Sequence, residues 1–355
     1  MTARLRVGVL GLHHDHVWRN LAAVATSGVG QVVAAAEPSP RLRERLAREH
    51  GGVALHPSYD ALFERTDLDA VLIFADNRAA AELGVRALGR GLPALVEKPM
   101  AADLAGAKAL LAAARASGLP LMVNWPTAWR PAIRYGVSLT LAGRVGEPVQ
   151  LGHRGGHAGP QEFGCSEEFS AWLYDPVRNG GGALVDYCGY GAVLARVLLG
   201  RPRAVTAVTA RLRKPDLRAE DTAVVVLRYP RAVAVLEASW TQVGAEPALG
   251  MVVYGDTGTL IVHQPRATRE GETVGPGRVQ VVTATGSEFL EPPPLPGSER
   301  DGPTFFLTCL REGRAVEGLC APDVGRDVQE ILEAAQQASG GGREVELPTT
   351  AGLAP

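Results

Sequence analysis

Short apolar strands alternate with helices through the first 125 residues of the chain. The strands are rich in Val, Leu, Ile and Ala with little polar alternation, which is typical of strands buried on both faces of a sheet. Short connections leave room for one helix between successive strands, as parallel pairing requires. This rhythm predicts a parallel, doubly wound α/β sheet. The expected strands are residues 6–10, 31–36, 70–75, 94–97 and 121–124. The expected helices are residues 17–26, 40–49, 59–64 and 78–90, and a long helix that is capped by Asp103 and runs to Ala116.

Beyond about residue 130 the pattern changes to longer strands in which apolar and polar residues alternate. Several follow one another without room for a crossover helix, so we expect antiparallel pairing. The sequence therefore divides into a dinucleotide-type domain over residues 1–125 and an α+β domain over residues 126–355 with a large, open, mostly antiparallel sheet. An uncovered sheet face of this size needs a partner subunit. The expected strands are residues 149–153, 204–212, 222–229, 232–240, 250–254 and 259–263, with covering helices at 191–199 and 323–339 and surface loops at 264–279 and 286–303.

Composition argues against several classes of partner and location. The net charge of −2 provides no broad basic field, so nucleic acid and anionic membranes are not expected partners. Hydrophobic residues at 46% and charged residues at 21% are ordinary for a soluble globular chain. The first apolar run, residues 7–12, is too short for a signal peptide or a spanning helix. Four widely spaced cysteines without metal-binding spacing indicate reduced thiols in the cytoplasm.

The first strand ends in a turn that departs from the usual dinucleotide-binding spacing, Gly-x-Gly-x-x-Gly. In this Rossmann-type motif a tight strand-to-helix turn lets pyrophosphate meet the helix N-terminus. Only the first glycine, Gly11, is kept, while His13 and His16 replace the other two. We expect the turn to hold the cofactor through Gly11, Leu12, His13, His14 and His16. The alternative is a wider turn whose histidines merely face solvent or a phosphate.

The same run, His13-His14-Asp15-His16, raises a second alternative, which is a metal site. Adjacent residues at the start of a helix rarely converge on one ion, and metal sites usually recruit more distant ligands. A histidine beside a phosphate is the more economical role. The sequence therefore predicts no metal site.

A carboxylate at the end of the second strand supports a nucleotide site independently. Glu37 lies 26 residues after Gly11, near the place where an acid hydrogen-bonds the adenosine ribose. A carboxylate there repels a 2′-phosphate, which favours NAD over NADP, although Arg41 is near enough to keep NADP open. The alternative role for Glu37 is an acid favoured by the dipole at a helix N-terminus.

Lys98 is one of only three lysines in the chain, and it follows the expected strand 94–97 in the run Glu97-Lys98-Pro99. An arginine does not lose its proton in such a place, whereas a partly desolvated lysine can titrate and can sit against a substrate hydroxyl. We also expect the Lys98–Pro99 peptide to be cis, which would aim the lysine into the cleft. The position therefore indicates chemistry rather than solubility.

These motifs resemble the Gfo/Idh/MocA family. Glu97-Lys98-Pro99 is similar to the family's Glu-Lys-Pro run at a strand end, and residues 180–190 are similar to its glycine-rich turn, with Asp186 followed by Tyr190. A strand ending in residues 254–259 also fits. The resemblance extends in order over nearly the whole chain. It implies a Rossmann domain followed by an α/β domain whose open sheet commonly forms oligomers, here a homodimer or homotetramer.

The resemblance also implies NAD(P)-dependent oxidation or reduction of sugars, cyclic polyols or related carbonyl compounds. Lys98 looks like the family's catalytic lysine and Asp186 like its substrate-orienting acid. Tyr190 stands where members have histidine or tyrosine. The residues expected near the cofactor beyond the turn are Glu37, Ala75, Asn77, Glu97 and Lys98.

Hydride transfer needs a group that takes or gives the alcohol proton, and we predict Tyr190 in this role, assisted by Lys98 and Asp186. A phenol has an ordinary pKa near ~10, and the Lys98 ammonium would lower this pKa by stabilising the phenolate. Each residue also has a structural alternative. Tyr190 could be a core tyrosine, Lys98 an ion-pair partner of Glu97, and Asp186 a helix cap. Cys188, between them, is expected to be buried packing.

Polar and aromatic residues near the domain junction are candidates for the substrate pocket, because polyols need hydrogen-bond donors and an aromatic wall. Tryptophans at a domain junction are about as often plain core residues. The residues predicted to bind the substrate are Asn124, Trp125, Arg130, His153 and Trp172, and further candidates are Trp129, Arg154, His157, Glu167 and Arg178.

Two other functions stay open from the sequence. One is an NAD-dependent glycosidase-type enzyme of the same fold, in which tightly held NAD oxidises the substrate transiently so that a glycosidic bond is cleaved. The other is a non-catalytic ligand sensor that has lost the cofactor. The missing glycines favour the sensor, whereas the retained Lys98, Asp186 and Tyr190 disfavour it.

Overall fold

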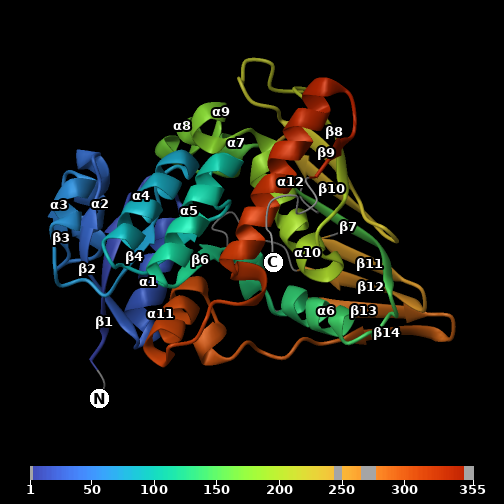
Figure 1. The fold of residues 1–355 in the computed structure, drawn as a ribbon, viewed down its shortest axis with the longest axis horizontal. Helices are drawn as coiled ribbons and strands as arrows, with labels where there is room; N and C mark the ends of the chain where they lie inside the picture. The colour runs from blue at the N-terminus through green and yellow to red at the C-terminus, as the bar shows by residue number, and fades with distance from the viewer. Residues whose placement is uncertain (1–2, 244–249, 265–276, 348–355) are drawn as a thin grey trace.

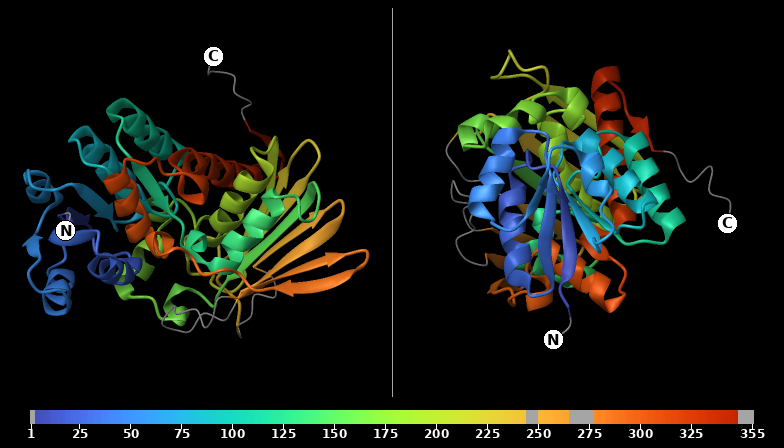
Figure 2. Two further views of the ribbon diagram at one scale, coloured as in Figure 1. Left: turned by 90° about the horizontal axis from the view of Figure 1, so that it is seen from below. Right: turned by 90° about the vertical axis from the view of Figure 1, so that its left-hand side faces the viewer.

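Two β-sheets, one from each half of the chain, lie side by side with helices between and around them (Figures 1 and 2). The computed structural model describes residues 3–243, 250–264 and 277–347. Within these ranges the N-terminal sheet has six strands and the C-terminal sheet has nine. The predicted fold class is confirmed: a doubly wound parallel sheet precedes an α+β unit with a large, mostly antiparallel sheet.

The N-terminal sheet consists of β1 (Leu5–Leu10), β2 (Gly30–Ala36), β3 (Ala54–His56), β4 (Ala70–Ile73), β5 (Ala94–Glu97) and β6 (Leu121–Asn124). Its helices are α1 (His16–Ser27), α2 (Pro40–Glu49), α3 (Tyr59–Phe63), α4 (Asn77–Gly89) and α5 (Leu104–Ser117). The strands pair in parallel in the order β3-β2-β1-β4-β5-β6. Chain order reverses between β1 and β4, which is the switch point where open α/β sheets bind ligands.

The C-terminal sheet consists of β7 (Pro148–Gly156), β8 (Ala204–Ala210), β9 (Thr222–Arg228), β10 (Val233–Ser239), β11 (Met251–Gly255), β12 (Gly258–His263), β13 (Arg278–Thr283), β14 (Gly286–Leu290) and β15 (Val345–Glu346). Its order is β14-β13-β12-β11-β7-β10-β9-β8-β15. β7 and β10 pair in parallel, and the other neighbours pair antiparallel. Buried residues alternate with more exposed ones in β9 and β10, so one face of the sheet is covered.

Helices pack on one face of the C-terminal sheet (Figure 2). The helices predicted at 191–199 and 323–339 are α10 (Gly189–Leu199) and α12 (Pro322–Gly341), and α6 (Pro131–Leu141) joins them. α12 also packs against α5, and α11 (Gly302–Glu312) packs against α1, so the end of the chain returns to the first half. The short helical segments are η1 (Pro126–Trp129), α7 (Pro160–Phe163), α8 (Glu167–Leu173), α9 (Pro176–Asn179), η2 (Leu184–Cys188), η3 (Gly297–Glu299) and η4 (Gly318–Cys320).

The surface loops predicted at 264–279 and 286–303 are wrong in part. β14 and the start of α11 fall within the second stretch, and β13 begins at the end of the first. Residues 265–276 lie outside the described residues. β14 is exposed along most of its length, so no alternation of apolar residues marks it in the sequence.

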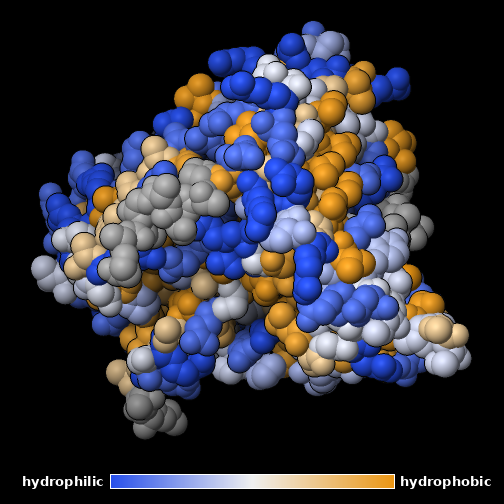
Figure 3. Space-filling model, turned by 45° about the vertical axis from the view of Figure 1, so that its right-hand side comes forward, coloured by the Kyte–Doolittle hydropathy of each residue, from blue (hydrophilic) through white to orange (hydrophobic). Residues whose placement is uncertain are grey.

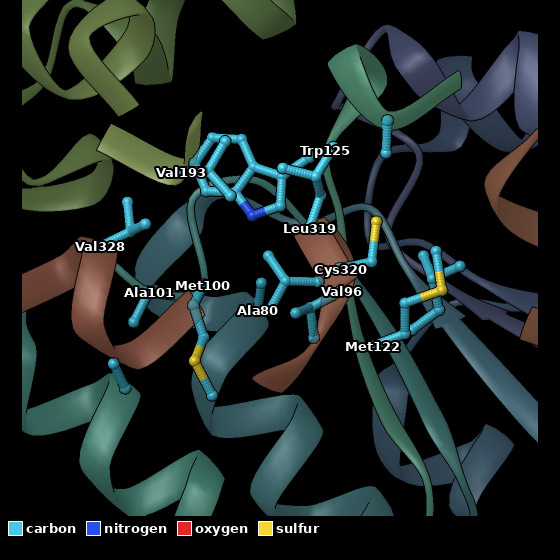
Figure 4. Packing of buried hydrophobic residues seen from close by; sticks show 14 of the residues in the cluster. Ala80, Val96, Met100, Ala101, Met122, Trp125, Val193, Leu319, Cys320 and Val328 are labelled. Carbon is cyan, nitrogen blue, oxygen red and sulfur yellow. The ribbon is translucent and has the colours of Figure 1, made fainter. Parts of the chain in front are cut away.

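One hydrophobic core runs across the junction of the two halves (Figure 4). Trp125, which follows β6, is fully buried near Val193 of α10, and Met100 and Val328 belong to the same core. The segment Pro176–Leu199 is long and apolar enough to cross a membrane, but 67% of its apolar window is buried inside the protein, as in a core helix. This shared core fixes the ends of β5 and β6 against the C-terminal helices.

A buried carboxylate holds the connection between β8 and β9. Asp221 is fully buried, and it accepts hydrogen bonds from the N–H groups of Leu212, Arg213 and Lys214 at 2.8 to 3.0 Å. The hydroxyl of Thr222 donates to the same carboxylate over 2.9 Å. The loop is therefore organised around one side chain.

Asp221→Ala should lower the free energy of unfolding by about 2–4 kcal/mol, because three backbone N–H groups lose their acceptor. Urea denaturation followed by circular dichroism measures this change. Asp216→Ala, at an exposed position in the same loop, is the matched control and should change stability by less than about 0.5 kcal/mol. Equal, small losses in the two variants would contradict the role of Asp221.

Candidate functional site

The ammonium of Lys98 is paired with a carboxylate from the other half of the chain. Lys98 follows β5, and its Nζ donates to Oδ1 of Asp186 over 2.6 Å. The other carboxylate oxygen, Oδ2, accepts from Nε1 of Trp240 over 3.0 Å. Lys98 is 5% and Asp186 7% exposed, so both charges lie away from bulk solvent. The Lys98–Pro99 peptide is cis, as predicted.

Glycine lets the segments that carry Lys98 and Asp186 approach each other closely. Gly180 has a φ of +89°, and a Cβ at this position would overlap the carbonyl oxygen of Ala102. Ala102 follows Lys98 by four residues, and Gly180 precedes Asp186 by six. The glycine-rich turn is therefore what brings the carboxylate to the end of β5.

Sequence reasoning missed two residues that hold Asp186 in place. The Glu220 carboxylate accepts from the N–H groups of Gly182 and Leu184 at 2.7 and 3.1 Å, which anchors η2. Trp240, just beyond β10, donates to Asp186 itself. An indole at the end of a predicted strand was an available signal for Trp240, whereas Glu220 sits in a connection whose sequence gave none. Asp186 lies on η2, a single π-helical turn of a kind often found at functional sites.

Tyr190 lies four residues beyond Asp186, on α10, with its ring toward Lys98. The Lys98 Nζ is 4.9 Å from the ring centroid, which is a cation–π distance. The ring of Trp125 meets Tyr190 edge-on at 5.8 Å, and the ring of Tyr187 lies 5.9 Å away. The structure thus brings together the ammonium, carboxylate and phenol selected from the sequence, and the lysine contacts the face of the phenol ring.

His157 stands beside this group, although the sequence suggested it only as one of several pocket candidates. Its ring stacks on Phe163 at 4.9 Å and meets Tyr187 edge-on at 5.2 Å. Nδ1 accepts from the N–H of Gly159 over 2.9 Å, which leaves Nε2 as the proton-bearing nitrogen of the neutral ring. Burial lowers the pKa of His157, while the charge of Asp186 opposes this shift. His157 is therefore a neutral, half-buried donor at the edge of the site.

The charge state of Lys98 differs from the expectation that this lysine can give up its proton. Burial acts to lower the pKa of Lys98, but Asp186 and Tyr190 outweigh burial, and the pKa lies above its ordinary value. Burial acts to raise the pKa of Asp186, but Lys98 and the bond from Trp240 hold it below its ordinary value. The expectation is wrong because Asp186 keeps the ammonium charged.

The predicted lowering of the Tyr190 pKa is also wrong in sign. Burial raises the pKa of Tyr190 and Lys98 acts to lower it, but burial prevails. The physical reason is that burial disfavours the charged phenolate, and the nearby Asp186 charge also acts to raise the pKa of Tyr190. The phenol therefore keeps its proton at neutral pH.

The end of β2 carries the predicted ribose acid in a fixed position. Glu37 is 3% exposed, its Oε2 accepts from the N–H of Leu12 over 2.6 Å, and its Oε1 accepts from that of Ser39 over 2.8 Å. The His13 imidazole lies 3.4 Å from Oε2 and accepts from the N–H of Asp76 over 2.9 Å. Burial acts to raise the pKa of Glu37, but His13 and the backbone donors hold it below its ordinary value. Glu37 is thus an ionised acceptor.

The turn after β1 keeps the glycine that a dinucleotide fold needs for close approach. Gly11 has a φ of +83°, and a Cβ there would lie 2.7 Å from the backbone nitrogen of Ala75, at the end of β4. Asn77, at the start of α4, donates through Nδ2 to Asn179 at 2.8 and 3.0 Å. Ala75 and Asn77 are both buried, and Asn77 ties the nucleotide half of the chain to α9.

The backbone donors of this turn are largely engaged within the chain. The N–H of Leu12 donates to Glu37, that of His14 to the carbonyl of Phe74 over 3.2 Å, and that of His16 to Nδ1 of His14 over 3.2 Å. In a glycine-rich turn such groups face the pyrophosphate. Here these three N–H groups are engaged within the chain, and imidazole side chains stand at two of the motif's glycine positions.

A short helix from the second half of the chain covers the turn. Ser166, which caps α8, donates through its N–H and hydroxyl to Asp15 at 2.7 and 2.6 Å. Trp172 of α8 donates through Nε1 to the carbonyl of His13 over 3.2 Å, and its ring lies 5.5 Å from that of His14. Trp172, predicted to bind the substrate, is 1% exposed, and its indole lies against the turn.

Three further predicted substrate residues are buried in packing or in internal hydrogen bonds. Trp125 is fully buried in the junction core (Figure 4). Asn124 donates to Oε1 of Glu97 over 2.7 Å and accepts from Nε1 of Trp129 over 2.8 Å. His153 is buried on β7, and burial lowers its pKa to about 4. Asn124 is thus held by internal hydrogen bonds, whereas Nε1 of Trp125 and Nδ1 of His153 have no hydrogen-bond partner among the described residues.

Arg130 is the predicted substrate residue that stays half-buried. Its guanidinium donates to Gln264, and its positive charge acts to lower the pKa of both Tyr190 and His153. Arg130 is therefore close enough to the phenol to influence its charge.

The residues expected at the adenosine-ribose end and at the catalytic end of a dinucleotide site are present, and the turn between them is altered. Glu37 offers an ionised acceptor at one end, and Lys98 lies at the carboxyl end of β5 at the other. Between them, His16 has the most exposed imidazole of the turn, with 26% of its side chain accessible against 14% for His13. The residues present therefore fit the ribose and catalytic ends of NAD, with histidines in place of glycine amides between them.

Two family models together match most of the chain. Residues 5–125 match the model described as an oxidoreductase family with an NAD-binding Rossmann fold. Residues 138–261 match the model of the GFO/IDH/MocA C-terminal domain.

Individual relatives carry the same likeness over different lengths. D-apiose dehydrogenase of Paraburkholderia graminis is 27% identical, with 99% of this chain and 91% of that protein covered. A dTDP-3,4-didehydro-2,6-dideoxy-α-D-glucose 3-reductase of Streptomyces violaceoruber is 34% identical, with 61% of this chain and 60% of that protein covered, less than two thirds of its length. A crystal structure of an oxidoreductase from Agrobacterium radiobacter, in complex with NAD+, L-tartaric acid and magnesium, shares the fold with a TM-score of 0.79, 20% identity and coverage of 97% and 99%.

Asp186→Asn should lower the free energy of unfolding by about 3–5 kcal/mol, because it leaves the Lys98 ammonium buried without a counter-charge. The double variant Lys98→Met/Asp186→Leu should lose less stability than the sum of the losses in Lys98→Met and Asp186→Leu made singly. Urea denaturation of the wild type, these two single variants and the double variant measures the coupling. Additive losses would show that the pair is not coupled.

The same pair sets a pH window for stability. The depressed pKa of Asp186 contributes stability above about pH 3.9, its unfolded value, and this is lost as the pH falls through the folded pKa. The raised pKa of Lys98 contributes stability below about pH 10.4, which is lost as the pH rises through the folded pKa. The pair therefore stays intact between these limits.

Proposed function

The chain belongs to the Gfo/Idh/MocA family of oxidoreductases with an NAD-binding Rossmann fold, and from this premise we propose that it transfers hydride between NAD and a sugar, a cyclic polyol or a related carbonyl compound. The observation that carries the proposal is the buried Lys98–Asp186 pair beside the Tyr190 ring, at the carboxyl end of the parallel sheet. D-apiose dehydrogenase and the deoxysugar 3-reductase support the substrate class, since both are named for sugars.

NAD supplies the hydride chemistry when it is bound, and the chain supplies position and electrostatics. Glu37 would accept a hydrogen bond from the adenosine ribose, as its two oxygens are fixed by backbone donors. The turn after β1 would lie along the pyrophosphate, and the ends of β4 and β5 would lie toward the nicotinamide. The residues assigned to the cofactor are Gly11, Leu12, His13, His14, His16, Glu37, Ala75, Asn77, Glu97 and Lys98.

Tyr190 acts as the acid that gives a proton to the substrate oxygen during reduction, and as the base that takes it during oxidation. Its raised pKa keeps the proton in place at neutral pH, which suits the donating direction. The Lys98 ammonium donates to the substrate oxygen and stabilises negative charge there. Asp186 orients the ammonium and keeps it charged.

We infer NAD rather than NADP as the preferred cofactor. An ionised Glu37 repels a 2′-phosphate. Arg41, the cation that could receive such a phosphate, forms an ion pair with Glu168 of α8. Because Glu168 already pairs with Arg41, this arginine is less available to a 2′-phosphate, which also favours NAD over NADP.

The engaged backbone donors of the turn favour one second candidate, a non-catalytic ligand sensor without cofactor. Titration of the purified protein with NADH, followed by nicotinamide fluorescence, separates the two, because only the enzyme should bind it. The glycosidase-type alternative is distinguished by its products: tightly held NAD, glycoside cleavage and no net NADH.

We propose a homo-oligomer, a dimer or a tetramer, that associates through the open face of the C-terminal sheet in the cytoplasm. Val208 of β8 is 66% exposed, and its neighbour across the strand pair, Val224 of β9, is 39% exposed. On the side of the molecule shown in Figure 3, apolar residues lie in groups between polar ones. The four cysteines, all in the described part of the chain, are free, which suits a reducing compartment.

Lys98→Ala and Tyr190→Phe should each lower kcat by about 10²- to 10⁴-fold while the protein stays folded, because each removes a group that acts on the substrate oxygen. NADH absorbance with a panel of aldoses and cyclic polyols measures the rate. Lys108→Ala, an exposed lysine on α5, and Tyr254→Phe, 41% exposed on β11, are matched controls that should keep the wild-type rate. Near-normal rates in both site variants would refute the mechanism.

The double variant Val208→Glu/Val224→Glu should convert the oligomer to monomers, because charge on a buried interface opposes association. Size-exclusion chromatography with light scattering gives the mass directly. Leu141→Glu, which changes a 62% exposed leucine at the end of α6, should leave the mass unchanged. A wild-type monomer, or an oligomer that both variants preserve, would contradict assembly through this face.

A further inference from the structure

Three side chains with metal-binding atoms converge where α1 begins. His14 lies in the turn, His16 is the first residue of α1, and Glu97 ends β5. One ligand atom from each side chain lies within 4.8 Å of the other two. The sequence predicted no metal site because adjacent residues alone rarely suffice, but Glu97 is the distant third group that such a site needs.

The turn separates the two histidines from the acid between them. Asp15 accepts two hydrogen bonds from Ser166 and so faces α8. The rings of His14 and His16 lie next to each other, with centroids 4.5 Å apart and planes at 54°. Both imidazoles can therefore reach one point without the aspartate.

His14 carries an unpaired nitrogen in a buried place. The residue is fully buried, and its Nδ1 accepts from the N–H of His16, which fixes the ring. Its Nε2 has no hydrogen-bond partner within residues 3–243, 250–264 and 277–347. An unpaired buried polar atom is unfavourable, and coordination of a metal ion is a common role for such an imidazole nitrogen.

Glu97 is oriented as metal-binding carboxylates are. Its Oε1 accepts from the amides of Asn124 and Asn20 at 2.7 and 3.4 Å, and its Oε2 lies 3.0 Å from Nδ1 of His16. Outer amides of this kind fix the orientation of a carboxylate ligand, and here they leave Oε2 directed at His16. Two ligand atoms about 2.0–2.1 Å from a tetrahedral ion lie about 3.3–3.5 Å apart. Oε2 of Glu97 and Nδ1 of His16 therefore need to move little to bind the same ion.

We propose that His14, His16 and Glu97 bind one divalent transition-metal ion. Two imidazoles and a carboxylate suit zinc and its neighbours in the first row, and three protein ligands leave a position for water or a ligand oxygen. The ion would add positive charge at the start of α1, where the N–H groups of Leu12, His14 and His16 are engaged within the chain. The three ligands are also among the residues assigned to the cofactor, so the ion would lie within the proposed cofactor site, but binding of the ion does not depend on hydride transfer.

The full chain, treated with a chelator and then titrated with Zn²⁺, tests the site. Calorimetry should show one ion per chain with a Kd on the order of 1 μM or tighter. Co²⁺ should give the visible absorption bands of a four-coordinate nitrogen and oxygen site. His14→Ala and His16→Ala should each weaken Zn²⁺ binding by more than about 100-fold. His263→Ala, on β12 in the other sheet, is the matched control and should bind as the wild type does.

Wild-type protein that binds no Zn²⁺ or Co²⁺ below about 100 μM would overturn the proposal. So would folded His14→Ala and His16→Ala variants that bind Zn²⁺ as tightly as the wild type. Glu97→Gln, which keeps the shape of the side chain, adds the third ligand to the test. Titration with NADH in the presence of chelator is scored separately, so that a failure of nicotinamide binding and a failure of metal binding can be told apart.

Discussion

The buried ion pair between Lys98 and Asp186 is the contact on which the arrangement of the site depends. Two charges that lie out of water need each other, since one left alone would destabilise the fold by several kcal/mol. Lys98 directly follows β5 and Asp186 lies on η2, 88 residues along the chain, so the pair forms only when the two halves dock. Trp240, which satisfies the second carboxylate oxygen, extends this requirement to the C-terminal sheet.

The same docking explains the altered turn after β1. In a glycine-rich turn the backbone is bare so that a phosphate can approach. Here α8 packs over the turn, with Ser166 bonded to Asp15 and Trp172 bonded to the carbonyl of His13. His16, which replaces a motif glycine, places its ring 6.3 Å from that of Phe169 on α8, and the neighbouring His14 ring packs near Phe169 and Trp172. The substitution at His16 is therefore part of how the two halves fit together.

Local sequence signals predicted the first half well, and long-range packing limited the rest. The bounds of β5, β6 and α2 follow from apolar runs and from proline and glycine at their ends, so the sequence placed all three without error. β14 and α8 have no comparable signal, because β14 is exposed and α8 is a short helix held by its contacts. Their existence depends on partners that lie far away in the chain.

The site was predictable to the level of residue types and not of electrostatics. The run around Lys98 and the glycine-rich turn before Asp186 resembled known motifs closely enough to select both residues. Which residues stay accessible was not predictable, since the burial of Asn124 and Trp172 depends on Glu97 and on the turn that they contact. A sequence names the donors and acceptors, but only the packed structure decides how many of them are already used.

Tyr190 shows how that difference decides chemistry. From the sequence, a lysine near a phenol should favour the phenolate, because an ammonium stabilises an adjacent negative charge. In the structure the ammonium is committed to Asp186 and meets the ring face, so burial prevails and the pKa of Tyr190 rises. A protonated phenol donates before it accepts. On the proposed mechanism a protonated Tyr190 therefore suits the donation of a proton to a substrate oxygen, whereas oxidation would require the phenol to lose its proton before it takes the proton of the substrate alcohol.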